Sequence, residues 1–221
     1  MKLAGKAFLR LLIGMSLVAI AIFPAAGGWN YWNGWLLMGV LFIPMLLMGA
    51  LMLLYSPQLL EKRMKNREEA RVQRWVVRLS GLMFVVNFLI AGLGYRYGWM
   101  MFPGWIVWLG VAIFLFSYIL YAEVMRENVY LSRIIEVQKG QKVVDTGLYR
   151  IVRHPMYAAT LFMFLAMPLI LGSVISFLIM LLYIPIIRLR IRNEEHLLES
   201  ELTGYKEYKR RVRYRLIPYL W

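Results

Sequence analysis

Long apolar stretches alternate with shorter polar ones along most of this 221-residue chain. A helix of about 20 apolar residues is long enough to cross a hydrocarbon core of about 30 Å. Four stretches of roughly this length occupy residues 11–28, 34–55, 79–95 and 105–124. The pattern therefore predicts an all-α, polytopic integral membrane protein.

The beginning of the chain could be either a cleaved signal peptide or a first membrane-spanning helix. Lys2, Lys6 and Arg10 precede the first apolar stretch and the small residues Ala25 and Ala26 lie near its end, which is also typical of a cleaved signal peptide. Because several further spans follow, we predict an uncleaved first helix. The mixed segment 57–78 is predicted to form an amphipathic helix on the membrane surface.

The longest apolar run covers residues 156–187. As one helix its roughly 32 residues would extend about 48 Å, which is too long for a single crossing without a large tilt. The sequence PLILGS at 168–173 places turn-compatible residues in its middle. We therefore predict a tight hairpin of two short spans, about 156–170 and 174–190, which makes about six transmembrane helices.

The distribution of charge supports this count. The net charge is +14, and with six crossings every one of the 26 Lys and Arg residues except Arg96 falls on the side of the two termini. This is the positive-inside pattern rather than a basic groove for nucleic acid, which we exclude as a partner. We expect an integral protein of the cell inner membrane, with both termini and the active site cytoplasmic.

The chain has no cysteine, which excludes disulfides, thiolate metal sites and cysteine catalysis, and we predict no metal site. In the tail, Leu197, Leu198, Leu202 and Tyr205 recur at helical spacing, so the last span is expected to continue into the cytosol as an amphipathic helix. We divide the chain into a four-span membrane region at 1–124 and a catalytic region at 125–221.

The unusual polar residues gather at the two ends of the predicted hairpin. His154, one of two histidines, lies just before the hairpin begins, and Glu194 lies just after it ends. A hairpin brings its ends together, so these two residues are expected to be neighbours in space. Arg190 and Glu194 are spaced four apart and share a helix face.

The local sequence around His154 suits an anion site. The residue precedes Pro155, which favours an extended backbone at 154 and is itself suited to the first turn of a helix. The free amides of a helix start favour an anion. A pocket with cationic, anionic and aromatic walls would suit a zwitterionic cofactor that carries a nucleoside.

Each of these polar residues can also be explained without a functional site. An Arg-His-Pro sequence is often only an interfacial turn, and Arg150 and Arg153 would then anchor the helix to headgroups. Asn87 is interpreted as a helix–helix hydrogen bond in the third span. His196 is expected to be exposed, because it stands among charged residues.

Several short motifs follow one another in an order that is similar to that of a known protein family. The matching pieces are NVYLS (128–132), VQKGQKVVDTGLY (137–149), RHPMY (153–157), RIRNEE (190–195), GYKEYKRRV (204–212) and IP (217–218). From about residue 128 to 218 the chain resembles the isoprenylcysteine carboxyl methyltransferase family, and more loosely the wider group that contains phospholipid methyltransferases.

The resemblance implies an integral membrane methyltransferase that uses S-adenosyl-L-methionine. The cofactor-binding residues that it implies are Gln138, Gln141, Lys142, Val143, Val144, Tyr149, His154, Pro155, Met156, Tyr157 and Glu194. It implies two catalytic residues, Arg190, which would hold the carboxylate of the acceptor, and His154.

Several alternatives stay open at this point. The favoured function is methylation of a carboxylate on an isoprenoid or lipid-like acceptor that enters from the bilayer, with membrane lipids and no obligate protein as partners. For an amine acceptor, which must be neutral to attack, His154 or Glu195 could act as a base. The alternatives are a phospholipid or small-amine N-methyltransferase, an NADPH-dependent membrane reductase of the sterol type, and a non-enzymatic membrane protein. The nearly charge-free spans argue against ion transport.

Overall fold

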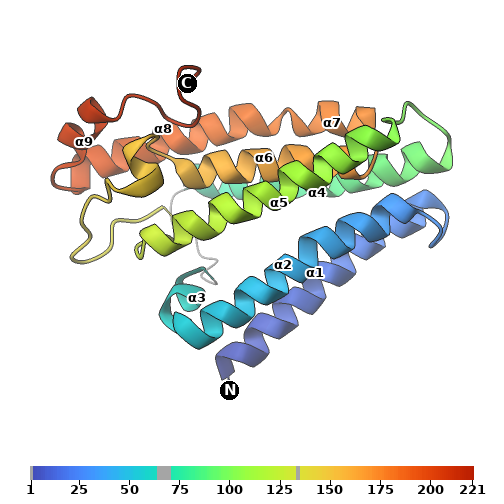
Figure 1. Cartoon of the computed structure of the whole chain (residues 1–221), viewed down its shortest axis with the longest axis horizontal. Helices are drawn as coiled ribbons and strands as arrows, with labels where there is room; N and C mark the ends of the chain where they lie inside the picture. Colours follow the sequence, from blue (N-terminus) through green and yellow to red (C-terminus); the bar gives the residue numbers. More distant parts are fainter. Residues whose placement is uncertain (1, 64–70, 133–134) are drawn as a thin grey trace.

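The computed structural model describes residues 2–63, 71–132 and 135–221, and in these ranges the regular structure is helical. The elements are α1 (Lys2–Ala26), α2 (Trp32–Tyr55), α3 (Pro57–Arg63), α4 (Arg71–Arg96), α5 (Gly104–Glu127), the 3-10 turn η1 (Gly147–Arg150), α6 (Pro155–Ile170), α7 (Val174–Met180), α8 (Tyr183–Glu201) and α9 (Tyr205–Arg211). Figure 1 shows α4 to α8 lying roughly side by side, with α1 and α2 running obliquely beneath them.

Within the described ranges, five apolar segments are long enough to cross a membrane. They are Leu3–Ala26, Trp32–Tyr55, Val77–Arg96, Gly104–Glu127 and Val174–Glu201. Their positions follow the sequence prediction closely, and an all-helical membrane protein is confirmed. The remaining predicted span, the fifth along the chain, is α6, whose 16 residues extend about 24 Å.

The predicted hairpin is present. α6 ends at Ile170 and α7 begins at Val174, so the apolar run is divided where the sequence indicated. Gly172 makes the turn with φ of +71°, a conformation that favours glycine. Ser173 then caps α7 by accepting a hydrogen bond from the amide of Ser176 at 3.3 Å.

The second arm of the hairpin is interrupted, which the sequence reasoning did not foresee. α7 ends at Met180 and α8 begins at Tyr183. Pro185 has no N–H to donate to the carbonyl of residue 181, and its ring crowds that carbonyl, which explains the break.

The third span agrees with the segment Val77–Arg96, but the surface helix predicted before it was wrong in extent. The third span was expected at 79–95, preceded by a surface helix over 57–78, but α4 already begins at Arg71 and α3 covers only Pro57–Arg63. Residues 64–70 of the predicted surface helix lie outside the described residues. The polar start of α4 is therefore a helical extension of the third span.

The tail is also not one helix. α8 continues past the apolar arm to Glu201, as expected, but Leu202 already has an extended backbone. Gly204, with φ of +86°, then starts the separate short helix α9. Leu202 and Tyr205 are nevertheless both buried, in one small cluster with Tyr208 and Val212.

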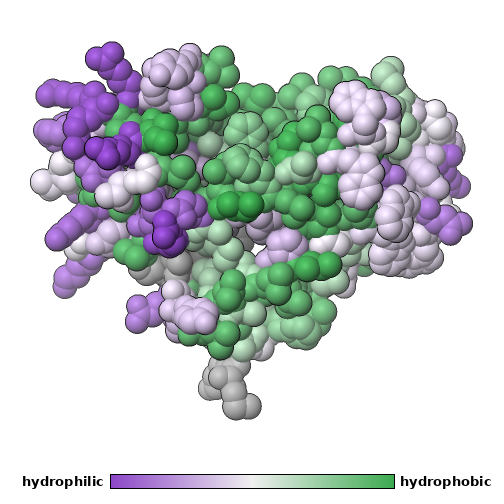
Figure 2. All heavy atoms as spheres, viewed as in Figure 1, coloured by the Kyte–Doolittle hydropathy of each residue, from purple (hydrophilic) through white to green (hydrophobic). Residues whose placement is uncertain are grey.

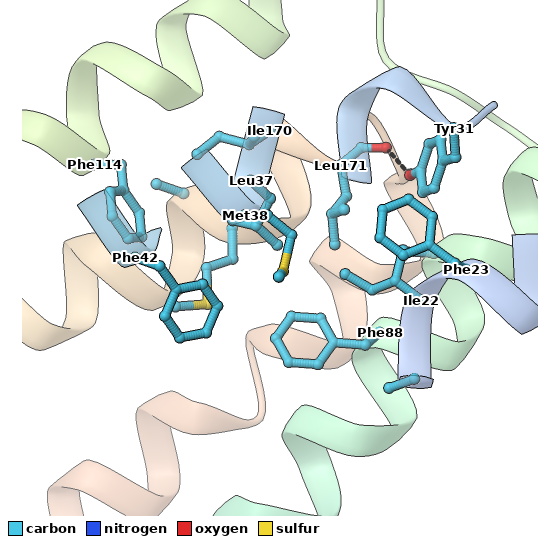
Figure 3. Packing of buried hydrophobic residues seen from close by; sticks show 14 of the residues in the cluster. Ile22, Phe23, Tyr31, Leu37, Met38, Phe42, Phe88, Phe114, Ile170 and Leu171 are labelled. Atoms are coloured by element: carbon cyan, nitrogen blue, oxygen red, sulfur yellow. Dashed lines mark hydrogen bonds between the residues drawn. The ribbon is translucent and has the colours of Figure 1, made fainter. Parts of the chain in front are cut away.

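The bundle is held together by close helix contacts around a large apolar core. A Cβ on Gly92 of α4 would lie 2.6 Å from the carbonyl oxygen of Ile22, and one on Gly110 of α5 would lie 2.8 Å from the Cβ of Leu169. These glycines let α4 approach α1 and let α5 approach α6. Figure 3 shows part of the core, where the Tyr31 hydroxyl donates to the Leu171 carbonyl and so ties the start of α2 to the hairpin turn.

Asn87 does not make the interhelical side-chain bond that was predicted. The residue is fully buried, and its side-chain amide has no hydrogen-bond partner among the described residues. The contact between α4 and α7 instead uses the backbone, because the Ser176 hydroxyl donates to the Asn87 carbonyl at 2.7 Å.

The two ends of the bundle differ in polarity. The segment 128–149, the end of α8, and α9 lie at one end, and the α6–α7 turn lies at the other (Figure 1). Figure 2 shows hydrophilic residues mainly at the α9 end, with apolar residues along the flank of the helices. The α9 end is called the basic end below, because it carries most of the exposed Lys and Arg residues of the described chain.

Candidate active site

A cavity opens at the basic end of the bundle. It lies among the segment 128–144, the start of α6, the middle of α8, and α9. Its empty space is about 850 Å³, including the part open to solvent.

Most of the site residues named from the sequence line this cavity. The lining includes ten of them: Gln141, Lys142, Val143, Val144, Tyr149, His154, Met156, Tyr157, Arg190 and Glu194. They come from three separate parts of the chain, which the hairpin and the segment before it bring together. The tertiary arrangement therefore gathers residues that the sequence separates by up to about 50 positions.

Gln138 and Pro155 do not line the cavity. The Gln138 side chain donates to the carbonyl of Tyr130 at 2.6 Å, and its backbone amide donates to the Gln141 side chain at 2.8 Å. Gln138 therefore shapes the loop that carries Gln141. Pro155 is buried at the first position of α6, where its missing N–H costs no helical hydrogen bond.

His154 precedes α6 as its N-cap residue and is buried. Its amide donates to the carbonyl of Arg215 at 2.9 Å, and its ring Nε2 lies 3.3 Å from Oε1 of Glu195. The hairpin thus brings His154 beside the α8 acidic pair, as the sequence predicted. The ring contact, however, is made to Glu195 and not to Glu194.

Tyr157 joins Arg190 to Glu194 inside the cavity. The Nε atom of Arg190 donates to the Tyr157 hydroxyl at 3.0 Å, and that hydroxyl donates to Oε2 of Glu194 at 2.5 Å. The i, i+4 spacing on α8 places both charged residues on the same face, as expected. A cation and an anion therefore stand on either side of one phenol within the cavity wall.

Glu195 is the centre of a second, buried charge cluster. Its Oε1 accepts from Nε of Arg153 at 2.8 Å, and its Oε2 accepts from Arg215 at 3.0 Å, with Lys209 at 3.6 Å. Glu195 is 3% exposed and is absent from the cavity lining. Because both oxygens already face cations, Glu195 is poorly placed to act as the base that the sequence reasoning considered for an amine acceptor.

Arg153 was interpreted as a possible headgroup anchor, but it is buried, with 7% exposed. Besides its bond to Glu195, its guanidinium donates to the carbonyls of Val212 and Arg213 at 2.6 and 2.7 Å. Arg153 therefore ties the start of the hairpin to the chain after α9. His196 is exposed, as predicted.

Tyr149 is fixed from two sides at the cavity wall. The Asn128 side chain donates to its hydroxyl at 2.8 Å, and the Tyr208 hydroxyl donates to its carbonyl at 2.8 Å. Burial raises the pKa of Tyr208, so its phenol stays protonated and remains a donor. The loop before α6 is therefore attached to both α5 and α9.

The turn η1 depends on an unusual glycine. Gly147 has φ of +47°, and a Cβ at this position would overlap the carboxylate of Glu127. That carboxylate accepts from the amide of Leu148 at 3.0 Å. The end of α5 thereby sets the position of Tyr149 two residues later.

Several lining residues were not assigned from the sequence. They are Asn128, Tyr130, Leu131, Ser132, Ile135, Glu136, Arg153, Leu198, Leu202, Tyr205 and Tyr208. Some belong to motifs that were recognised, such as NVYLS and GYKEYKRRV, but no role was attached to them individually. The tyrosine spacing in the second motif was the available signal for an aromatic wall.

The lining is chemically mixed. It contains the acids Glu136 and Glu194, the cations Lys142 and Arg190, aromatic rings and aliphatic side chains. The hydroxyl of Tyr205 is buried in this wall and has no hydrogen-bond partner among the described residues. Burial raises the pKa of Tyr205, so its phenol stays neutral. These groups fit a ligand with a flat ring, hydroxyls and charges of both signs.

Part of the chain matches a known protein family. The family model described as phospholipid methyltransferase matches residues 105–203, from the start of α5 to the turn before α9. This range includes the hairpin, Glu194 and Arg190. The predicted resemblance to the wider group that contains phospholipid methyltransferases is thereby confirmed, and this match indicates a methyltransferase embedded in the membrane. The narrower resemblance to the isoprenylcysteine carboxyl methyltransferase family stays a prediction.

Proposed function

We propose that the protein transfers a methyl group from S-adenosyl-L-methionine to a lipid-like acceptor that reaches the cavity from the bilayer. The observation that carries the proposal is the Arg190–Tyr157–Glu194 group in the cavity wall, within the range of the family match. It offers an anionic and a cationic contact next to each other. Methyl transfer likewise requires that the site of the methyl donor lie directly beside the site of the acceptor.

The cofactor is assigned to the Glu194 side of the cavity. Glu194 would bind its polar groups, and the aliphatic residues Val143 and Val144 would contact its base. When bound, S-adenosyl-L-methionine supplies a methyl group that is already activated by a sulfonium. The task of the chain is therefore to bind, to orient and to exclude water.

The acceptor is assigned to the Arg190 side. A carboxylate is ionised at neutral pH, so the protein needs no base to activate it. A guanidinium can hold a carboxylate through two parallel hydrogen bonds, which fixes the direction of an attacking oxygen. Methylation of a carboxylate on an isoprenoid or lipid-like molecule is therefore the favoured reaction.

N-methylation of a phospholipid headgroup is the second candidate, and the family match favours it. Arg190 would then pair with the phosphate instead of a carboxylate. This reaction requires a neutral amine and a group that takes up its proton. His154 lines the cavity and is the candidate for that role, because both oxygens of Glu195 are engaged by cations.

The proposed arrangement in the membrane has six crossings, with α6 as the fifth. The basic end would then face the cytoplasm of a cell whose inner membrane holds the protein, in agreement with the positive-inside bias. Both termini would lie on that side. In this arrangement residues 1–124 provide a membrane scaffold, and residues 125–221 carry the cofactor and acceptor sites.

The first experiment is a calorimetric titration of S-adenosylhomocysteine into the purified protein in detergent. We expect binding by the wild type and its loss in Glu194→Gln. Glu201→Gln, an exposed carboxylate on the same helix, is the matched control and should bind as the wild type does. A folded wild-type protein that fails to bind would refute the cofactor assignment and make NADPH the next titrant.

The second experiment separates the two acceptors. Radiolabelled methyl transferred to a carboxylate is released as volatile methanol by mild base, whereas an N-methyl group is not. Incubation with a prenylated carboxylic acid and, separately, with phosphatidylethanolamine shows which product forms. Arg190→Ala should keep S-adenosylhomocysteine binding and lose transfer, whereas Arg192→Ala, exposed on the same helix, should keep both.

A further inference from the structure

The chain that follows α9 turns back toward the bundle. Residues 212–221, here called the return segment, lie beside α8 and the start of α6 (Figure 1). The amide of Arg153 donates to the carbonyl of Tyr214, and the amide of His154 donates to that of Arg215, both at 2.9 Å. The return segment is thus attached to the two residues that immediately precede α6.

The inner side of the return segment packs against the apolar part of α8. Leu216 is 3% exposed and belongs to the same apolar cluster as Tyr183 and Ile187 of α8, and Ile217 and Trp221 pack against this cluster. Tyr183 and Ile187 lie about 14 and 20 Å along the helix from the start of the span at residue 174. Both distances are shorter than a hydrocarbon core of about 30 Å.

The outer side of the return segment is apolar and uncovered. Tyr219 is 91% exposed and Leu220 is 78% exposed, at the tip of a tight turn that also contains the exposed Pro218. The exposed Arg213 precedes this tip. Apolar and aromatic side chains next to a cation are typical of segments at a lipid–water interface.

Much of the backbone of the turn is hydrogen-bonded within the turn itself. The amides of Arg215, Leu216 and Ile217 all donate to the carbonyl oxygen of Trp221, at 3.0, 3.0 and 3.2 Å. The amides of Leu220 and Trp221 donate in return to the carbonyl of Ile217, at 3.2 and 3.1 Å. These bonds lower the cost of placing this part of the backbone at the lipid–water interface, where its other polar groups still bond to water.

We propose that the tip of the return segment, residues 218–220, is inserted into the lipid leaflet at the basic end of the bundle. The occupant of this surface is the bilayer, because the return segment packs on the apolar part of α8 through Leu216, and because its outer side combines exposed apolar side chains with the exposed Arg213 that precedes them. The anchored segment also presents Arg215 to Glu195, at 3.0 Å, behind the cavity. Lipid therefore supports one wall of the candidate active site.

The absence of cysteine makes a direct test possible, because a single introduced cysteine carries a label alone. A nitroxide is attached to Leu220→Cys in the full-length protein in liposomes, and its collisions with oxygen and with a water-soluble nickel chelate are compared. Leu178→Cys, exposed on α7 within a span, is the lipid reference. Thr203→Cys, exposed in the turn before α9, is the water reference.

The expected result is a several-fold excess of oxygen over nickel collisions at position 220, close to that at 178. Tyr219→Cys should behave in the same way, which protects the test against failure of one variant to fold. Nickel collisions at 220 equal to those at 203 would overturn the proposal in favour of a solvated turn. Protection from both reagents, with spin–spin broadening between labels, would overturn it in favour of contact with a second copy of the chain.

Discussion

Replacing Glu195 by Gln is predicted to destabilise the protein and to disturb the site without removing any cavity-lining group. Glutamine keeps the shape of the side chain but loses its charge. The Arg153 side chain, 5% exposed, would then remain buried without a counter-ion. In addition, the new NH₂ group would face a cation, because each oxygen of Glu195 accepts from one.

The expected loss of stability follows from the burial of the Arg153–Glu195 ion pair. Removing one partner of a buried ion pair typically costs about 3–5 kcal/mol. Arg153 keeps its bonds to the carbonyls of Val212 and Arg213, so we expect the lower end, about 3 kcal/mol. For a chain of this size that corresponds to roughly 6–12 °C in melting temperature.

Glu199 provides the matched control. It lies one turn further along α8 and pairs with Lys209, the same lysine that approaches Glu195, but both side chains of this pair are about one-third exposed. Exposed pairs contribute about 0–1 kcal/mol. Glu199→Gln should therefore melt within a few degrees of the wild type.

Two measurements test the prediction. Tryptophan fluorescence follows thermal unfolding in detergent, and ¹⁵N-histidine NMR follows the ring that contacts Glu195. The chain has two histidines, so His196, which is exposed, serves as an internal reference. Glu195→Gln should shift the ring signals of His154 and leave those of His196 in place. Equal melting temperatures for the Glu195 and Glu199 variants, with unchanged His154 signals, would refute this account of the cluster.

Three further substitutions test the packing, each by thermal unfolding of the purified protein. Gly147→Ala should cost at least about 1–2 kcal/mol, because the residue has positive φ and a Cβ would overlap the Glu127 carboxylate. Gly92→Ala should cost about 1–3 kcal/mol by forcing α4 away from α1, whereas Gly81→Ala, on the same helix with open space around it, should be neutral or stabilising. Asn87→Leu should raise the melting temperature, because it removes a buried amide that has no partner among the described residues; a lower melting temperature would contradict this reading.

Much of the fold followed from the sequence because the membrane restricts it strongly. Apolar stretches of sufficient length form helices wherever backbone groups cannot bond to water. The ends of the spans near Ala26, Tyr55 and Ile170 were therefore predicted to within a few residues. The division of the run 156–187 was recoverable because one helix of that length exceeds the bilayer.

The errors occurred where hydropathy gives no signal. The polar start of α4 was assigned to the membrane surface, although its helix simply continues into the span. The break before Tyr183 depends on Pro185, and the end of α8 depends on the turn at Gly204. These are local effects on the backbone within stretches whose hydropathy does not change.

For the candidate site, too, the sequence predicted some features and left others undetermined. Types of residue and their order in the motifs identified Glu194, Arg190 and Tyr157, and a hairpin implied that they would meet. The sequence could not assign partners, since Glu194 and Glu195 are adjacent and identical. On a helix, neighbouring positions differ in direction by about 100°, so one carboxylate enters the cavity and the other enters the buried cluster.

The sequence by itself determined that this is a helical membrane protein with its polar chemistry at one end, because length, hydropathy and charge order are properties of the chain. Only the tertiary structure decided which of those polar groups are buried together. Arg153, Glu195 and Arg215 come from three separate elements, and their pairing depends on how the return segment packs on α8. Such pairing is set by the balance of desolvation against contact in the folded state, which no local pattern encodes.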